Sequence, residues 1–214
     1  MSGNNYHILS TAFCVIVIIS NVISAKMVSL PFFQNFSIPV GLLTYPLSFF
    51  LSDLVTEIYG AVKARRMVYL ALGMSFLSFL IIKMALVLPS PTIENHHQFQ
   101  GAFGLSGTVL FGSLTAYIVS QTVDIQIYTR IKMWTGESHL WLRNNGSTFI
   151  AQLIDTAIVN VVHLYMGMGL EMAQVIWIIL FSYTYKCTVS VVMTPFFYLM
   201  VSTFKAIPKV KYRL

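Results

Sequence analysis

Five charged side chains lie inside stretches of this chain that are otherwise apolar enough to cross a lipid bilayer. They are Asp53, Glu57, Asp124, Asp155 and Lys186. A charge in hydrocarbon is costly, so charged residues inside membrane segments usually mark a transport pathway or a polar ligand site. The sequence therefore predicts recognition of a polar solute within a membrane bundle.

The pattern Gln-x-x-Asp occurs twice, at Gln121 to Asp124 and at Gln152 to Asp155. Residues three or four apart share one face of a helix, so each pattern predicts a polar stripe that faces the bundle interior. At 1.5 Å per residue, four of the charges fall roughly 8 to 15 Å from one membrane surface. These four are Asp53, Asp124, Asp155 and Lys186. We expect them to meet in one layer.

Such a layer suits a flat ligand that is rich in N–H donors. Carboxylate and amide oxygens accept hydrogen bonds, a lysine holds the acidic charges together, and aromatic rings provide stacking surfaces. The candidate substrate-binding residues are Asp53, Glu57, Tyr59, Gln121, Asp124, Tyr128, Gln152, Asp155, Tyr183 and Lys186, with Tyr45 and Phe49 nearby. The structural alternative is that the polar pairs only join helices. Glu57 lies nearest the interface, where it could instead meet water or pair with Arg65 or Arg66.

Composition places these residues in an integral membrane protein. Of 214 residues, 57% are hydrophobic and 9% are charged, and the mean hydropathy is +0.75. A spanning helix needs about 20 apolar residues, and six runs meet that length. We expect an all-α single domain over residues 1–214, a bundle of six transmembrane helices at about 6–30, 39–59, 67–88, 106–128, 147–168 and 172–204. Pro195 is expected to kink the last run or to separate a membrane helix from an interfacial tail.

The positive-inside rule gives the expected orientation. Ten of the 13 Lys and Arg residues follow the second, fourth and sixth runs, at Lys63, Arg65, Arg66, Arg130, Lys132, Arg143, Lys205, Lys209, Lys211 and Arg213. Both termini of this multi-pass membrane protein are therefore expected to be cytoplasmic.

Several other functions are disfavoured. The net charge of +6 comes from short basic clusters between apolar runs, which argues against nucleic-acid binding. No His-Glu metal motif, nucleophile turn or Walker loop is present, so we expect no metal, no cofactor and no catalytic residues. Cys14 and Cys187 lie within apolar runs and form no readable motif. A membrane-embedded enzyme and a structural subunit of a larger complex stay open as alternatives.

Four segments carry a family resemblance. They are Asp53-Leu54-Val55-Thr56-Glu57-Ile58-Tyr59-Gly60 with Ala64-Arg65-Arg66; Ala116 with Gln121-Thr122-Val123-Asp124 and Tyr128; Ser147-Thr148 with Gln152-Leu153-Ile154-Asp155-Thr156; and Tyr183 with Tyr185-Lys186. In this order, on six hydrophobic runs, they resemble the bacterial queuosine precursor transporters, also called vitamin-uptake-transporter-like proteins.

The resemblance implies inward transport, across a bacterial inner membrane, of a 7-deazaguanine for tRNA modification, such as the nitrile precursor, the aminomethyl precursor or queuine. It also implies a fold similar to the substrate-binding subunits of energy-coupling-factor transporters. Energy-coupling subunits or a homo-oligomer are therefore partners to consider, besides the lipid bilayer. A guanine-type edge offers two N–H donors that one carboxylate, Asp155 or Asp124, could accept as a fork. The ligand carbonyl would need a donor such as Lys186 or a Gln amide.

Overall fold

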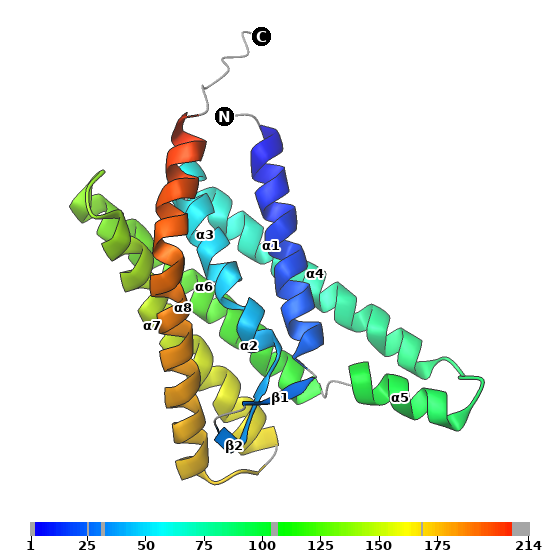
Figure 1. The fold of residues 1–214 in the computed structure, drawn as a ribbon. Helices are drawn as coiled ribbons and strands as arrows, with labels where there is room; N and C mark the ends of the chain where they lie inside the picture. Colours follow the sequence, from blue (N-terminus) through cyan, green and yellow to red (C-terminus); the bar gives the residue numbers. More distant parts are fainter. Residues whose placement is uncertain (1–2, 25, 31–32, 104–106, 168, 207–214) are drawn as a thin grey trace.

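The apolar runs of the sequence form long helices, and one short hairpin interrupts them (Figure 1). The computed structural model describes residues 3–24, 26–30, 33–103, 107–167 and 169–206. The helices are α1 (Gly3–Ile23), α2 (Gly41–Thr44), α3 (Pro46–Tyr59), α4 (Ala61–Val87), α5 (Ile93–Phe103), α6 (Gly107–Thr135), α7 (Leu140–Asn160), the π-helix η1 (Val161–Gly167) and α8 (Met172–Ala206). The strands are β1 (Met27–Leu30) and β2 (Phe33–Pro39).

The hairpin corrects the expected first span at residues 6–30. The helix α1 ends at Ile23, and β1 pairs antiparallel with β2 so that Met27 lies opposite Pro39. A proline at position 31 disfavours helical backbone at the residue before it and offers no N–H of its own. The apolar run therefore continues as extended chain after α1.

The second expected span, at residues 39–59, is also divided. Its first residues end β2 and form the single turn of α2, and the helix α3 begins at Pro46. Proline fits the first turn of a helix, where its missing N–H has no partner to lose. The 14 residues of α3 extend roughly 21 Å, which is less than the ~30 Å of a bilayer core.

Four helices of the described chain are long and apolar enough to cross a membrane: α1, α4, α7 together with η1, and α8. The helix α6 has 29 residues, but it is not among the four and it carries several polar and charged side chains. The helix α8 continues through Pro195 to Ala206, so this proline does not separate off an interfacial tail. Residues Lys209, Lys211 and Arg213 lie outside the described residues.

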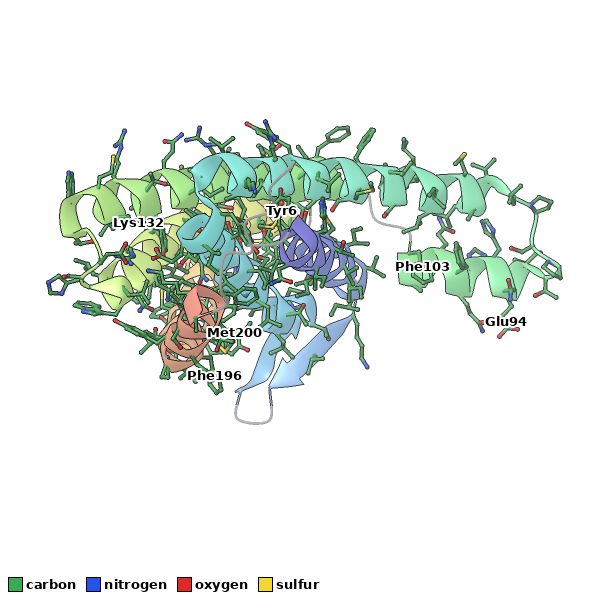
Figure 2. The ribbon with its side chains drawn as sticks, turned by 90° about the horizontal axis from the view of Figure 1, so that it is seen from above. Tyr6, Glu94, Phe103, Lys132, Phe196 and Met200 are labelled. Carbon is green, nitrogen blue, oxygen red and sulfur yellow. The ribbon has the colours of Figure 1, made fainter. Side chains whose placement is uncertain are left out.

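The far half of α4 projects from the bundle together with α5, which lies between the third and fourth expected spans (Figures 1 and 2). No residue of α5 is buried, and Figure 2 shows Glu94 at the outer end of α5 and Phe103 at its inner end, nearer the bundle. Large apolar side chains on this part of α4 are exposed, including Leu80, Ile81 and Met84. These two elements therefore add nothing to the packed core that holds the polar residues.

The bundle has one basic end. The start of α1 and the end of α8 lie at this end (Figure 1), where Tyr6 donates a hydrogen bond to the Lys63 carbonyl at 3.1 Å. The same end holds Lys132, Arg143 and Lys205, which gather around one carboxylate. The positive charges that are separate in the sequence are thus neighbours in space.

Candidate functional site

Polar stripes on α3, α6 and α7 face one another in the middle of the bundle. Their side chains are fully or almost fully buried, although each helix presents apolar residues on its other faces. The buried polar set includes Ser52, Asp53, Thr56, Glu57, Ser120, Gln121, Asp124, Ser147, Thr148, Gln152, Asp155, Thr156 and Lys186. The helical spacing of these residues thus produces the expected interior faces.

Asp155 and Lys186 form a closed pair between α7 and α8. The Lys186 Nζ lies 2.9 Å from Asp155 Oδ2 and donates a second hydrogen bond to Thr156 Oγ1 at 3.1 Å. The other carboxylate oxygen of Asp155 accepts hydrogen bonds from Tyr45 at 3.1 Å and Ser120 at 3.4 Å. The Lys186 ammonium also lies 5.0 Å from the centre of the Tyr45 ring. Asp155 is therefore well supplied with donors from the protein itself.

Asp53 and Asp124 form a second group, in which two acids lie beside each other within hydrogen-bonding reach. Thr148 donates to Asp53 Oδ2 at 3.2 Å. The other oxygen of Asp53 and both oxygens of Asp124 have no hydrogen-bond partner among the described residues. This group therefore has acceptor capacity that the described part of the chain leaves unused.

Gln121 and Gln152 add four more buried polar atoms without partners. Both side chains are fully buried, and within the described chain neither the amide nitrogen nor the amide oxygen of either residue makes a hydrogen bond. Gln121 lies three residues before Asp124, and Gln152 lies four residues after Thr148, so both share the faces of the acidic group. Buried polar groups are normally satisfied. Their concentration here indicates a place built to hydrogen-bond something else.

Glu57 belongs to a third group at the basic end. Its carboxylate lies 3.0 Å from Arg143, 3.1 Å from Lys132 and 3.2 Å from Lys205, and it accepts a hydrogen bond from Tyr128 at 3.0 Å. Arg143 is 1% exposed and also donates to the backbone carbonyls of Gly136 and Ser138. These contacts join α3, α6, α7 and α8 at one point. Arg65 and Arg66, the partners considered from sequence, are exposed on α4 instead.

The charges lie at successive levels, whereas we expected one layer. On α7, Arg143 contacts Glu57, Thr148 contacts Asp53, and Asp155 contacts Lys186. Thr148 and Asp155 are seven residues apart, which corresponds to roughly 10 Å along the helix. Gln121 and Gln152 occur in sequence between these levels. The expected single cluster is thus a polar column with an unsatisfied middle section.

The tyrosines contact different levels of the polar column. Tyr45 reaches Asp155, and Tyr128 is bound to Glu57. Tyr59 lies at the end of α3, with its ring centre 5.5 Å from that of Tyr6 and 5.3 Å from Lys63 Nζ. Tyr183 lies half-buried on α8 beside Cys187. Among the described residues, no hydrogen bond joins Tyr59 or Tyr183 to Asp53 or Asp124.

A small cavity opens beside the middle section, between α3, α7 and α8. It is lined by Pro46, Phe49, Phe50, Asn144, Thr148, Ser190 and Met193. Thr148, which donates to Asp53, forms part of this wall, so the cavity adjoins the unsatisfied polar atoms. The aromatic rings of Phe49 and Phe50 form part of its apolar lining.

Sequence reasoning missed Arg143, Tyr45 as a hydrogen-bond donor, and Ser120. Arg143 was counted among the basic residues that follow the fourth expected span, whereas it lies in the first turn of α7. Helical spacing did not point to it, because a residue five positions before Thr148 lies roughly 140° away from it around the helix. Tyr45 and Ser120 depend on packing between helices, so their partner could not be read from spacing.

Comparison with known proteins identifies the family. Residues 39–200 match the sequence model of the family described as "putative vitamin uptake transporter". The chain is 34% identical over 163 residues to a protein of Bacillus subtilis (strain 168) named "probable queuosine precursor transporter"; the match covers 74% of this chain and 69% of the relative. A protein of the same name from Haemophilus influenzae is 26% identical over 143 residues, covering 63% of this chain and 55% of the relative.

No solved structure matches the chain at a significant level. The family match covers more than half of the sequence and includes all four motif segments. The polar column at the centre of the bundle lies within the matched region. The chain therefore belongs to the family of vitamin uptake transporters that includes the queuosine precursor transporters.

Proposed function

We propose that this chain imports a queuosine precursor of the 7-deazaguanine class and binds it at the middle of the polar column. The observation that carries the proposal is the set of buried polar atoms without partners on Asp53, Gln121, Asp124 and Gln152. An unsatisfied buried group costs about 1 to 3 kcal/mol. A ligand that supplies the missing hydrogen bonds would offset several such costs at once.

The donor edge of the heterocycle fits Asp124 best. A guanine-type ring presents N1–H and an exocyclic amine side by side, and one carboxylate can accept both. Asp124 has two oxygens without partners among the described residues, whereas both oxygens of Asp155 already accept hydrogen bonds. Of the two acids considered from sequence, we assign to Asp124 the fork, in which one carboxylate accepts both ligand N–H donors. The ring carbonyl would accept a hydrogen bond from the amide of Gln121 or Gln152.

The Asp155–Lys186 pair and the Glu57 group close the column on either side in this proposal. Asp155 links α6, α7 and α8 to the start of α3, through Ser120, Lys186 and the N-cap residue Tyr45. Glu57 links the same helices one turn beyond Asp53. Passage of a ligand requires one of these groups to part, so both are expected to act as gates more than as ligand contacts.

We also propose that α3 and α6 lie within the membrane and complete a six-helix bundle. Short or polar helices are tolerated at membrane depth where their polar groups are covered by protein. The basic end would face the cytoplasm by the positive-inside rule, which places the start of α1 and the end of α8 on that side. The exposed apolar side chains of α4 and α8, such as Met84 and Phe196, would then face lipid; Phe196 is labelled in Figure 2.

Uptake by cells that cannot make the precursor tests the proposal. Asp124→Asn should abolish growth-supporting import of a labelled 7-deazaguanine, because the amide replaces one acceptor oxygen by an NH₂ donor that would face one of the two ligand N–H groups. Glu94→Gln makes the same chemical change on the exposed helix α5 and should leave import unchanged. If Asp124→Asn, expressed at the parent level, imports as well as the parent, then the assigned site is wrong.

A further inference from the structure

The pairing of Asp53 with Asp124 poses a chemical problem that the ligand alone does not solve. Two carboxylates are both acceptors, so they cannot hydrogen-bond to each other unless one carries a proton. These two lie within hydrogen-bonding reach and are fully buried. Ionised acids this close in a dry site repel strongly, and one of them takes up a proton instead.

Cations elsewhere in the bundle do not relieve this repulsion. Lys186 of α8 is held by Asp155 and Thr156, and Lys132, Arg143 and Lys205 at the basic end surround Glu57. Glu57, one turn away on α3, adds a further negative charge that acts on Asp53.

The remaining neighbouring helices contribute little charge to the pair. On α6 the nearest titratable group beyond Asp124 is Tyr128, which donates to Glu57. On α7 the charged residues Arg143 and Asp155 are engaged with Glu57 and Lys186 respectively. On α4 the basic residues Lys63, Arg65 and Arg66 are exposed, and on α1 the buried titratable group is Cys14. Among the described residues, no cation therefore contacts either of the two acids.

We propose that Asp53 and Asp124 form a proton-binding site that holds one shared proton, and that ligand binding is linked to this proton. When Asp53 and Asp124 are both treated as ionised acceptors, Oδ1 of Asp53 and the two oxygens of Asp124 lack a hydrogen-bond partner within the described chain. A single proton between the two acids explains this, because it lets one acid donate to the other. Thr148 donates to Asp53 Oδ2, which leaves Oδ1 as the oxygen that carries the proton towards Asp124. The amides of Gln121 and Gln152, on the same faces, complete the polar lining.

The linkage to the ligand follows from the assigned fork and rests on the proposed function. When the N–H edge of a neutral heterocycle docks on Asp124, that carboxylate must be ionised, so the proton stays on Asp53. Loss of the proton would leave two negative charges facing one neutral ligand, and the ligand would bind less well. A proton is thus the second ligand of the site.

Infrared difference spectroscopy of the purified full-length chain tests the proton site without any substrate. A protonated buried carboxyl absorbs separately from carboxylates and shifts in D₂O. We expect the parent to show this band at neutral pH and to lose it at alkaline pH, and Asp53→Asn and Asp124→Asn each to lack it. Glu57→Gln is the matched control, because Glu57 is buried but held by three cations and should contribute no such band.

The link is tested by measuring the affinity for the neutral 7-deazaguanine nitrile across pH. In the parent the Kd should rise about tenfold for each pH unit above the point where the infrared band disappears, as expected for one linked proton. In Asp53→Asn, whose amide cannot ionise, the Kd should not change over the same range.

Absence of the band from the parent at every pH where the protein is folded, or its persistence in both variants, overturns the proton site. A parent Kd that does not depend on pH overturns the link. If the band behaves as expected and no 7-deazaguanine binds, the proton site holds and the proposed substrate is wrong. The two proposals can therefore fail separately.

Discussion

Replacing Lys186 by methionine should destabilise the bundle strongly, because it leaves Asp155 buried without its cation. Asp155 is 1% exposed, and the Lys186 ammonium lies 2.9 Å from its Oδ2. Removing one partner of a buried ion pair costs about 3 to 5 kcal/mol. Tyr45 and Ser120 still donate to the other oxygen, which favours the lower value of about 3 kcal/mol.

For a chain of this size, 1 kcal/mol corresponds to a shift in the melting temperature of about 2 to 4 °C. The Lys186→Met variant should therefore melt about 6 to 12 °C below the parent in the same detergent. The double variant Asp155→Asn, Lys186→Met removes both charges together and should recover most of that loss. The assay is thermal unfolding followed by intrinsic fluorescence or by loss of the monodisperse peak in size-exclusion chromatography.

The control is Lys83→Met on the projecting half of α4, where the ammonium makes no salt bridge within the described chain and lies 5.4 Å from the centre of the Phe79 ring. Its melting temperature should change little. If Lys186→Met melts with the parent, or if the double variant is less stable than the single one, then the pair is not the buried ionic link described above.

Three further predictions follow from the contacts. Arg143→Met should destabilise the protein by about 3 kcal/mol, because Arg143 is buried against Glu57. Lys132→Met removes a cation that is 31% exposed and should cost about 1 kcal/mol or less. Equal melting temperatures of the two variants would contradict this ranking. Gly41→Ala should destabilise the junction of α1 and α2, because a Cβ there would overlap the Ser20 carbonyl oxygen and the Ser24 hydroxyl. The control is Gly73→Ala, whose Cβ would meet nothing within 4 Å in the described part of the chain. Thermal unfolding scans compare the two variants, and equal stability would refute the clash. The hydrogen bond from Lys205 holds the pKa of Glu137 below its usual value. This contact therefore stabilises the fold at neutral pH and is lost as the pH falls through that lowered pKa. In Lys205→Met the pKa of Glu137, measured by carboxyl NMR, should rise to its usual range, and an unchanged pKa would contradict the contact.

The helix interior faces could be predicted from sequence, because they depend on spacing within one helix. Gln121 with Asp124 and Gln152 with Asp155 were assigned to inward faces by the helical repeat alone, and all four are buried. The Asp155–Lys186 contact could be anticipated by estimating how far along its helix each residue lies. The family motifs gave the same residues independently.

Other features depended on contacts between distant segments. The partners of Glu57 come from positions 75, 86 and 148 residues later, so nearby Arg65 and Arg66 looked like the more natural candidates. The hairpin at residues 27–39 arises inside apolar runs that by composition alone read as helix, and only its prolines indicated a break. The division of the charges into levels depends on how the helices are staggered, which spacing within a single helix does not determine.

The central claim is that the unsatisfied polar atoms of Asp124, Gln121 and Gln152 hold a flat, nitrogen-rich ligand. Equilibrium binding to the purified chain tests it most directly, with the 7-deazaguanine nitrile, queuine, guanine and an unrelated vitamin measured side by side. The account predicts that a 7-deazaguanine binds the parent, and that Asp124→Asn and Gln152→Leu each weaken binding at least tenfold while Glu94→Gln does not. Equal binding by the parent and both core variants would contradict it.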